Sequence, residues 1–439
     1  MSALPGMVTP ALLKILETPI DLLRQKPLTP AQQYEIYLYV RDAYVHEPSS
    51  RGIPGVLTLD SGFPGNTLTL SGGLHSNEPC FTGAMAMALA MVHQGHVLGG
   101  RIKLIVNNLE GLEKYWHSYI QTSEPMSERS GHRFVHYNMN RIPYLLGDVA
   151  DAYWAFRNAY PGQYATVEEA AARDAGVWQA LQRLYAFERR MLDENPIPGF
   201  EGRMRYETQR LLELMPAYYE DVPQGREQLV IDYHSMSAPG TPMLLSSDSV
   251  VTGPKMIFSK VKGCASLLLS NFAQLTAQAT GLALYAHIMS KSADTMTVAI
   301  ECGQHEDMKN TSMPSVLVAA ESAYDTMAAL GLTLFARANA ATRVRIWEAV
   351  ELLFPPVKDG SYRFTELFPN GRILEEGTVY GTSHNPAHPP MVAHKRMGMI
   401  FATTPEKPMP TAESAATLVD VYEGIRNRRG ELEVVGLAR

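Results

Sequence analysis

The chain has 439 residues, of which 46% are hydrophobic and 19% are charged, and its 38 Lys and Arg against 45 Asp and Glu give a net charge of −7. This composition supplies a large apolar core and excludes a disordered chain. The mild acidity and the lack of a long basic run argue against nucleic-acid and membrane partners and favour a small polar molecule. No apolar run reaches about 20 residues and no secretory leader is evident, so we expect a soluble, cytoplasmic protein and leave a homo-oligomer open.

Short β-type runs alternate with helical runs from residue 55 onward, and this alternation is typical of an α/β fold. An Ala- and Met-rich segment at 81–92 predicts a buried helix. Several of the β-type runs are apolar almost throughout, as central parallel strands are. We therefore predict a mixed, mostly parallel sheet flanked by helices. Its predicted strands are 56–59, 67–70, 103–106, 229–231 and 296–300.

Two further regions interrupt or follow that pattern. Residues 145–223 consist of long helix-forming runs and predict a helical insertion within a catalytic domain that spans residues 1–340. Residues 341–439 contain short β-type pieces separated by Pro and Gly pairs, which predicts a small β-rich C-terminal domain. We expect this domain to end in an amphipathic helix. The apolar stripe that predicts the helix consists of Leu418, Val421, Tyr422 and Ile425.

The first candidate site follows the predicted strand 67–70, where the chain continues as SGGLHSNEP over residues 71–79. His75 and Glu78 thus lie in a loop at the carboxyl end of a strand, which is where open α/β sheets place their ligand sites. A three-residue separation lets an imidazole and a carboxylate converge on one cation, and the glycines allow a sharp turn. A chance occurrence is the alternative interpretation of this pair alone.

A second histidine, His234, follows the predicted strand 229–231. If the two strands are neighbours, His234 points into the same crevice as the first loop. Two histidines and one glutamate form a known catalytic zinc set that leaves a coordination position for water. A simple loop hydrogen bond is the alternative role. Asp232 would support His234 from behind if the strand extends that far.

A third predicted strand, 296–300, runs directly into Glu301. Burial at this position would raise the pKa of the Glu301 carboxyl toward the range useful for a general base. A structural carboxylate at a strand end is the alternative. We expect its neighbour Cys302 to be a small buried apolar residue, because the sequence shows no electropositive setting that would activate a thiolate.

Between the two histidine segments lies GHRFVHYNMNR, residues 131–141, which contains two arginines and two asparagines. A guanidinium offers a planar fork of donors, so Arg133 and Arg141 are candidates to bind a carboxylate or to polarise a carbonyl. Solvated surface arginine is the alternative. The order of these segments along the chain, more than any one of them, indicates a single site.

That order and those motifs resemble the succinylglutamate desuccinylase/aspartoacylase family, a branch of the zinc carboxypeptidase superfamily. HSNE at 75–78 resembles the family's HGNE zinc motif, and DYHS at 232–235 resembles its DLHT motif. NMNR at 138–141 is similar to its DxNR motif, and ECG at 301–303 is similar to its ExG motif. Arg133 stands where the family keeps an arginine that polarises the scissile carbonyl.

The resemblance implies a zinc carboxypeptidase-like fold and a Zn²⁺ ion held by His75, Glu78 and His234. It implies that Glu301 is the general base that takes a proton from the attacking water. Arg133 is then expected to stabilise the oxyanion of the tetrahedral intermediate. The three ligands come from two distant segments, so this assignment requires both to meet at one point.

The resemblance also implies a substrate with a free carboxylate, bound by Asn140 and Arg141 with Asn138 beside them. It covers about residues 67–332, less the helical insertion. The chain departs from the family where Ser76 replaces a glycine, which leaves the ligand pair intact. It departs again where Asn138 replaces an aspartate, which removes a negative charge near Arg141 and bears on substrate preference.

The activity implied is that of a zinc-dependent hydrolase that cleaves the amide bond of a small N-acyl amino acid. The nearest alternative is a metallocarboxypeptidase acting on short peptides, which uses the same zinc chemistry in a more open cleft. Acyl transfer to an amine is a second alternative, although no glycine motif for phosphate or dinucleotide binding is present. A non-catalytic zinc-binding scaffold protein is the third.

Overall fold

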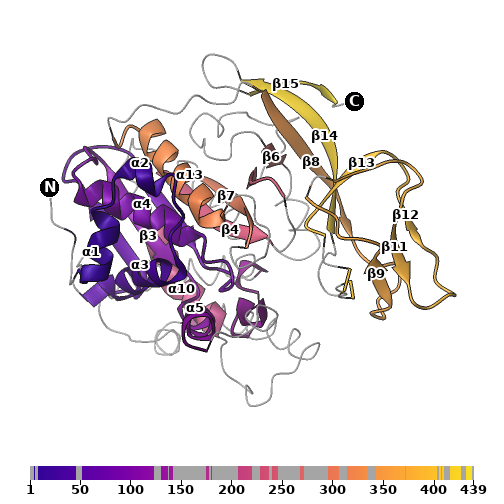
Figure 1. Ribbon diagram of the computed structural model, residues 1–439, viewed down its shortest axis with the longest axis horizontal. Helices are drawn as coiled ribbons and strands as arrows, with labels where there is room; N and C mark the ends of the chain where they lie inside the picture. The colour runs from indigo at the N-terminus through magenta and orange to yellow at the C-terminus, as the bar shows by residue number, and fades with distance from the viewer. Residues whose placement is uncertain are drawn as a thin grey trace.

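The computed structural model contains one large mixed sheet, a small three-stranded sheet and several helices. Helices lie beside its central strands, and the C-terminal strands lie at the end of the molecule away from the N-terminal helices (Figure 1). The described residues are 4, 8–45, 52–122, 130–136, 138–141, 175–176, 179, 206–219, 228–236, 240–245, 267–270, 295–305, 314–333, 343–370, 372–402, 405–406, 408–409, 416–426 and 432–437.

The large sheet has twelve strands within these residues. Its centre is parallel, since β3 pairs with β2, β2 with β4 and β4 with β7 in the same direction. The edge strand β1 is antiparallel to β3, and β5 is antiparallel to β7. In spatial order the strands are β1 (Val56–Asp60), β3 (Arg101–Val106), β2 (Thr67–Gly72), β4 (Gln228–Met236), β7 (Thr295–Gln304), β5 (Met243–Leu245), β6 (Leu267–Ser270), β8 (Arg343–Leu353), β14 (Ala416–Arg426), β13 (Met397–Ile400) and β10 (Arg372–Leu374), with β15 (Leu432–Leu437) beside β14.

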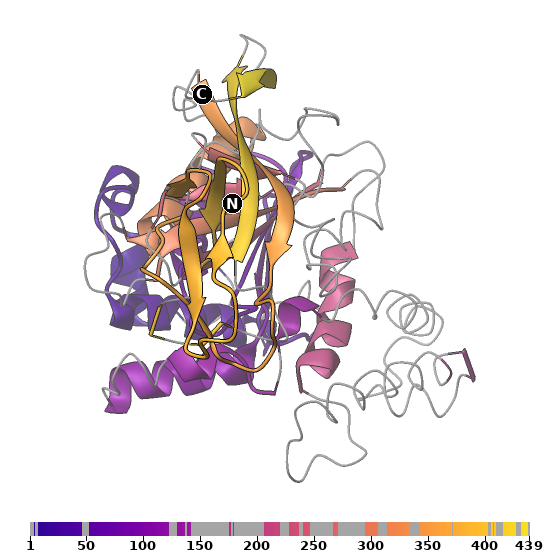
Figure 2. The same ribbon diagram turned by 90° about the vertical axis from the view of Figure 1, so that its right-hand side faces the viewer.

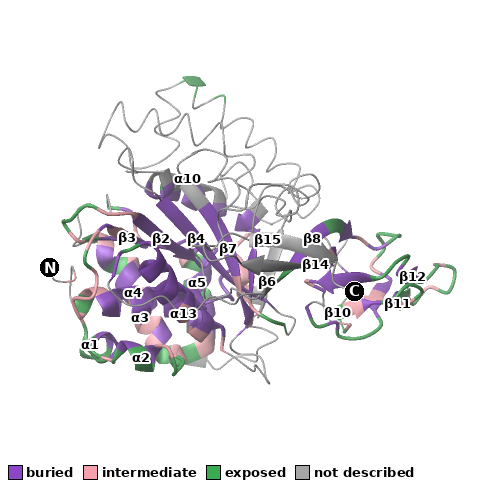
Figure 3. Ribbon diagram, turned by 90° about the horizontal axis from the view of Figure 1, so that it is seen from above, coloured by how far each residue is buried: buried purple, intermediate pink, exposed green. Residues whose placement is uncertain are grey.

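The helices cover both faces of the central strands. Helix α10 (Tyr206–Tyr219) lies on one face, and α3 (Pro30–Asp42), α4 (Phe81–His93) and α13 (Ser315–Ala329) lie on the other (Figures 2 and 3). The remaining helices are α1 (Pro10–Leu16), α2 (Ile20–Leu23) and α5 (Leu109–Trp116), which continues as the π-helix η3 (His117–Thr122). Short 3₁₀ helices form η1 (Ala43–Val45), η4 (Ser130–Arg133) and η5 (Met139–Arg141). No described helix combines the length and apolar character needed to cross a bilayer.

Helix α4 is the centre of the core, and it is buried from Phe81 to Met91. Its small Ala and flexible Met side chains allow it to pack on every side. It lies so close to α13 that a Cβ atom on Gly83 would fall 1.9 Å from the carbonyl oxygen of Val316. Only glycine fits at this contact. The described α/β part thus confirms the predicted buried helix.

The predicted strands of the α/β part are all present, each within a few residues of its predicted bounds. The N-terminal helices α1 and α3 were not predicted. Each begins with a Thr-Pro pair, in which Thr9 or Thr29 caps the helix and the proline occupies its first turn. This cap motif is the signal in the sequence that would have predicted both helices.

The predicted β-rich C-terminal region is confirmed, and it includes the small sheet β9 (Tyr362–Phe364), β11 (Val379–Ser383) and β12 (Met391–Val392). The predicted terminal helix is wrong, because residues 416–426 form strand β14. This strand pairs with β8 on one side and with β13 and β15 on the other. Thr417, Val419 and Val421 are β-branched at every second position, and pairing on both sides outweighed the helical spacing of the apolar residues.

Two predictions lie largely outside the described residues. Of the predicted insertion at 145–223, the structure describes helix α10 and a few residues before it, and α10 agrees with a helical segment. The predicted boundary near residue 340 falls between the described segments 314–333 and 343–370. The sheet itself continues across that point, because β6 pairs in parallel with β8.

Candidate metal centre

The first two ligand residues lie in the loop that follows β2. Gly73 has a φ of 72°, in the left-handed region, and a Cβ atom on Gly72 would fall 2.2 Å from the Cβ of Phe81. The loop therefore needs glycine at both positions in order to fold back over the start of α4. This path turns His75 and Glu78 into the protein, where both side chains are buried.

His234 reaches the same place from β4, the strand next to β2. The two strands are parallel, and Ser71 on β2 lies opposite Asp232 on β4, so their carboxyl ends meet at one edge of the sheet. Strand β4 continues to Met236, so Asp232 and His234 project on the same face, as the prediction for Asp232 required. The structure thus brings the two histidine segments together.

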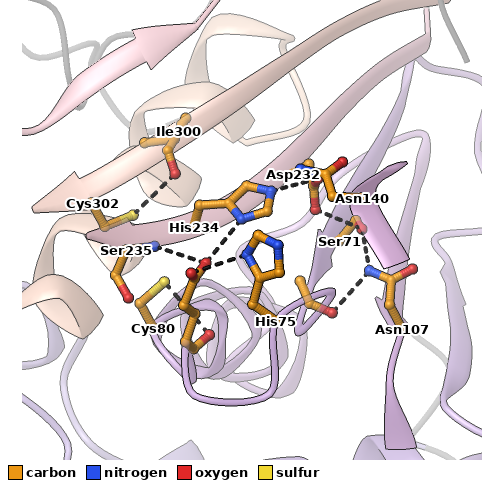
Figure 4. A network of polar contacts seen from close by, with 12 residues as sticks. Ser71, His75, Cys80, Asn107, Asn140, Asp232, His234, Ser235, Ile300 and Cys302 are labelled. Carbon is orange, nitrogen blue, oxygen red and sulfur yellow. Dashed lines mark hydrogen bonds and ion pairs between the residues drawn. The ribbon is translucent and has the colours of Figure 1, made fainter. Parts of the chain in front are cut away.

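The three side chains converge through their polar atoms. His75 Nδ1 lies 3.0 Å from Glu78 Oε1, and His234 Nδ1 lies 2.9 Å from Glu78 Oε2. The two imidazole rings lie side by side, with centroids 5.1 Å apart and their planes tilted by 56° (Figure 4). Each residue offers one ligand atom, and these atoms all lie within 4.8 Å of one another. No other group of this kind occurs among the described residues.

Both imidazoles are held from behind by acceptors. The Nε2–H of His234 donates to Asp232 Oδ2 at 2.9 Å, because a carboxylate can only accept. His75 Nε2 lies 3.0 Å from the Asn138 side-chain oxygen, which also accepts from the Asn140 backbone N–H. The Nδ1 atoms of both rings point at the Glu78 carboxylate, where each can either donate an N–H or offer its lone pair to a cation.

The electrostatics of this group call for a cation. Burial and the Arg133 guanidinium lower the pKa of His75 to about 4, so its ring is neutral at pH 7. Burial opposes the charge on Glu78, but His75 and Arg133 hold the pKa of Glu78 well below its usual value. Burial also opposes a charge on His234, yet Asp232 and Glu78 raise its pKa well above the usual value. In the metal-free chain, a proton on His234 therefore supplies the positive charge beside the Glu78 carboxylate.

The residues present fit a divalent metal ion. Two neutral imidazole nitrogens and a carboxylate are the donor set of catalytic zinc sites. Each Nδ1 atom lies about 3 Å from a Glu78 oxygen, a spacing that a proton bridges in the metal-free chain, and a shared metal ion can take the place of that proton. Asp232 and Asn138 supply the outer partners that orient metal-bound imidazoles.

Glu301 lies beside this centre on the next strand of the sheet. Strands β4 and β7 pair in parallel with His234 opposite Glu301, so the two side chains share a face. The strand runs on to Gln304, past the predicted end. Burial raises the pKa of Glu301 to about 8, Glu78 and Asp232 act in the same direction, and His234 and Arg133 oppose it. Its buried Oε2 has no hydrogen-bond partner among the described residues.

Arg133 approaches the centre from η4. Its Nη1 donates to Glu78 Oε1 at 2.6 Å, and its Nη2 lies 3.2 Å from His75 Nε2. The side chain is 36% exposed, whereas that of Glu78 is 3% exposed, so Arg133 lies on the open side of the ligand group. It is therefore placed to contact both the centre and a molecule that enters from solvent.

The segment 138–141 lies next to the centre. Asn138 and Asn140 are buried, and Asn138 contacts His75 directly. The backbone of Arg141 ends η5, and its side chain lies outside the described residues. Cys302 is buried with its Sγ toward the Ile300 carbonyl, as expected for a small apolar residue.

A buried polar network behind Asp232 was not predicted. Ser71 Oγ donates to Asp232 Oδ1 at 3.2 Å and accepts from the Asn107 side-chain amide at 2.9 Å. Tyr218 OH lies 2.6 Å from both Ser71 Oγ and the Asn107 side-chain oxygen. Figure 4 shows Ser71 and Asn107 beside Asp232. These residues come from β2, the end of β3 and α10, so no local motif signals the network.

Comparisons with known proteins give matches to solved structures alone, since no family model and no curated protein matches the chain. The succinylglutamate desuccinylase of Chromobacterium violaceum is 14% identical, with 84% of this chain and 88% of that chain covered and a TM-score of 0.45. A succinylglutamate desuccinylase/aspartoacylase from Rhodobacter sphaeroides is 12% identical, with 81% and 86% covered and a TM-score of 0.46.

A third match is the product-bound ectoine utilization protein of Ruegeria pomeroyi, which is 13% identical, with 84% of this chain and 88% of that chain covered and a TM-score of 0.46. The two matches named as desuccinylases belong to the family that the sequence motifs resemble. With identities of 12–14% and TM-scores of 0.45–0.46, these matches carry no argument about activity, which has to come from the site.

Proposed function

We propose that this chain is a zinc-dependent hydrolase that cleaves the amide bond of a small N-acyl amino acid. The observation that carries the proposal is the convergence of His75, Glu78 and His234 beside Glu301 and Arg133. The first three are a donor set for zinc, and the last two supply a proton acceptor and a cation next to it. The motifs HSNE, NMNR and ECG support the same activity through their resemblance to the desuccinylase/aspartoacylase family.

His75, Glu78 and His234 would hold the ion, which when bound polarises a water molecule and the substrate carbonyl as a Lewis acid. Glu301 accepts a proton from the attacking water. Its pKa of about 8 lies close to neutral pH, where a general base is most effective, and the positive charge of Arg133 favours its carboxylate form. Glu301 then returns the proton to the amine as the carbon–nitrogen bond breaks. The products are a carboxylic acid and a free amino acid.

Arg133 faces the open side of the centre and donates to the developing oxyanion. One such donor typically contributes about 2.7–4 kcal/mol to lowering the barrier. The side chain already contacts Glu78 and His75, so it is held within reach of a carbonyl bound beside them. We assign the substrate carboxylate to Asn140 and Arg141, with Asn138 beside them, on the strength of the NMNR motif.

The proposal is tested on the full-length protein by elemental analysis and by a substrate panel. The panel contains N-acyl amino acids with a free carboxylate, their amidated forms and short peptides. We expect about one zinc per chain and hydrolysis confined to the acyl amino acids. Faster cleavage of the peptides would indicate a carboxypeptidase instead, and stoichiometric zinc without any hydrolysis would indicate a zinc-binding scaffold.

The role of Glu301 is tested by Glu301→Gln, which keeps the shape of the side chain and removes its basicity. We expect zinc content to stay at the wild-type level and turnover to fall by about 10²–10⁴-fold, the usual contribution of a general base. Retained zinc with near-normal turnover would rule out Glu301 as the base.

A further inference from the structure

Helix α10, which belongs to the predicted insertion, contacts two parts of the candidate site: the segment after Arg133 and the polar network around Asp232. At its start, Tyr206 and Glu207 contact the segment that follows Arg133. At its end, Tyr218 contacts Ser71 in the network behind Asp232. In the middle, buried Arg210 donates to the carbonyl oxygens at the end of β3. The helix is thus fastened to the sheet along its length.

Glu207 makes the contact that bears on the arginine. Its Oε1 accepts from the backbone N–H groups of Val135 at 2.6 Å and of His136 at 2.9 Å. The Glu207 side chain is fully buried. A buried carboxylate is costly unless it is hydrogen-bonded, and charge-assisted bonds of this kind are short and strong. The backbone just after Arg133 is therefore held by an acceptor that has no path to solvent.

The same segment is held from the other side by the ligand loop. The Arg133 carbonyl oxygen accepts from the backbone N–H of Ser76, between the two ligands of that loop, at 2.8 Å. The Tyr206 backbone N–H donates to His136 Nδ1 at 3.4 Å, which joins the segment to the first turn of α10. Arg133 itself bears the first attachment and lies just before the second, and its partly exposed side chain contacts Glu78.

We propose that Glu207 is a positioning residue for Arg133, and that helix α10 thereby sets the guanidinium against the metal ligands. The inference rests on the proposed function for the catalytic role of Arg133, and on geometry alone for the link between Glu207 and Arg133. Glu207 acts through the backbone of residues 135 and 136, with its Oε2 also 3.4 Å from His136 Nδ1, and within the described residues no hydrogen bond or ion pair joins it to the metal ligands.

The link is tested with three variants of the zinc-loaded, full-length protein. Glu207→Leu keeps the volume of the side chain and removes both acceptor oxygens. Glu207→Gln keeps one oxygen that can accept the two N–H groups. Glu213→Gln is the matched control, because Glu213 is the same residue type on the same helix, is 50% exposed, and gives up only an ion pair with Arg210 Nη1 at 3.3 Å. Should Glu207→Leu fail to fold, Glu207→Asp, which retracts the carboxylate, replaces it.

Amide hydrogen exchange measured over residues 130–136 tests the attachment directly. We expect the amides of Val135 and His136 to exchange about tenfold faster in Glu207→Leu, as the loss of a buried hydrogen bond permits. We expect exchange within about twofold of wild type in Glu207→Gln and in Glu213→Gln. Unchanged exchange in Glu207→Leu would overturn the proposal.

Zinc affinity, measured by competition with a chelator, tests whether the effect passes through Arg133. Removal of the guanidinium in Arg133→Ala takes a cation away from Glu78, so we expect zinc to bind about five- to tenfold more tightly. Glu207→Leu should shift the affinity in the same direction, and the double variant should match Arg133→Ala. Weaker zinc binding in Glu207→Leu, or effects of the two changes that multiply, would contradict a route through Arg133.

Kinetics separates this proposal from the proposed function. If the wild type hydrolyses an acyl amino acid, Glu207→Leu should lower kcat about 10-fold or more with KM little changed, and should have no further effect in the Arg133→Ala background. If the wild type hydrolyses nothing on the panel, the proposed function fails, and the exchange and zinc measurements still decide whether Glu207 positions Arg133.

Discussion

Two histidines of this protein have similar polar neighbours in very different surroundings. His234, in the α/β part, lies between Asp232 and Glu78, and all three side chains are at most 5% exposed. Its two ring nitrogens contact one carboxylate each. Neither carboxylate can be reached by solvent, so the charges act on one another at nearly full strength.

His388, in the C-terminal β-rich part, also has carboxylate, hydroxyl and amide neighbours. Its Nδ1 lies 3.2 Å from Ser361 Oγ and from Ser383 Oγ and 3.7 Å from Asp359 Oδ2, while Nε2 faces the Asn385 amide. The cluster is open, since the Asp359 side chain is 41% exposed. Its polar groups have water as a further partner and need no ion.

The difference shows that burial and the direction of the lone pairs make a metal centre, whereas residue types alone do not. The His234 group directs acceptor atoms at one buried point. In the His388 group, several polar neighbours surround the single atom Nδ1 close to solvent. These contacts hold neighbouring loop segments together. Matched substitutions in the two clusters therefore test this conclusion.

The largest difference is expected between His234→Ala and His388→Ala. The first removes a zinc ligand and leaves Glu78 and Asp232 as buried carboxylates without their partner, which costs about 3–5 kcal/mol. The second removes part-buried, mostly neutral hydrogen bonds and a stacking contact with Tyr362, leaves no buried charge without a partner, and should cost less, about 1 kcal/mol. Denaturant unfolding and zinc stoichiometry measure both effects. Similar losses in the two variants would contradict the contrast between the clusters.

A smaller effect is expected when the partner carboxylate is neutralised. Asp232→Asn weakens the acceptor behind His234 and should lower zinc affinity by about 10–100-fold, as loss of an outer partner usually does. Asp359→Asn makes the same change beside His388 and should leave zinc affinity at the wild-type value. Chelator competition measures both. Wild-type affinity in Asp232→Asn would show that the contact between Asp232 and His234 does not support the metal.

The pH dependence of stability should differ between the two regions in the metal-free protein. The folded-state pKa of Glu301 is about 8, above its ordinary value of 4.5. Below pH 4.5 the Glu301 carboxyl is protonated in both the folded and the unfolded protein. Between pH 4.5 and 8 it loses its proton in the unfolded protein but keeps it in the folded protein. The wild type therefore loses stability relative to Glu301→Gln as the pH rises through this range. The Oε2 atom of Glu301 is buried but the residue as a whole is partly exposed, which limits the difference to about 1–2 kcal/mol at pH 8.

Unfolding of the metal-free proteins at pH 4, 6 and 8 measures this divergence. Glu351→Gln, which removes an exposed glutamate on the C-terminal strand β8, is the matched control and should run parallel to wild type. Parallel curves for Glu301→Gln would mean that burial does not raise the pKa of this carboxyl.

The smallest effect is expected from a gain of charge behind His75. Asn138→Asp places a carboxylate where an amide oxygen now accepts, which makes the imidazole a better ligand. We expect zinc to bind about three- to tenfold more tightly. Asn385→Asp, the corresponding change beside His388, should leave the affinity unchanged. A weaker site in Asn138→Asp would show that a neutral partner suits His75 better.

Much of this site was predictable because each ligand segment carries a recognisable pattern within a few residues. His75 and Glu78 follow an apolar strand, His234 and Glu301 lie near the carboxyl ends of two others, and the carboxyl ends of neighbouring parallel strands meet at one edge of a sheet. The β-type runs and the buried helix at 81–92 were equally predictable, because periodicity and apolar content can be recognised within short segments. The Thr-Pro caps of the N-terminal helices are local signals of the same kind and are sufficient to predict where those helices begin.

The remaining features depend on partners that are distant in the sequence. Residues 416–426 have apolar spacing that suits a helix, and only the strands on either side make them a strand. Glu207 and Tyr218 look like ordinary polar positions of a helix until the sheet places them against Val135 and Ser71. A local pattern carries no information about such contacts.

The sequence by itself therefore determined the chemical identity of the donors and the strand ends on which they sit, because both are properties of short segments. Tertiary structure alone decided that the acceptors share one buried point, that Glu301 faces His234, and that a helix from the predicted insertion holds the segment after Arg133. The reason is physical: the pKa values and the demand for a cation arise from burial and from charges a few ångströms apart, and chain folding creates both.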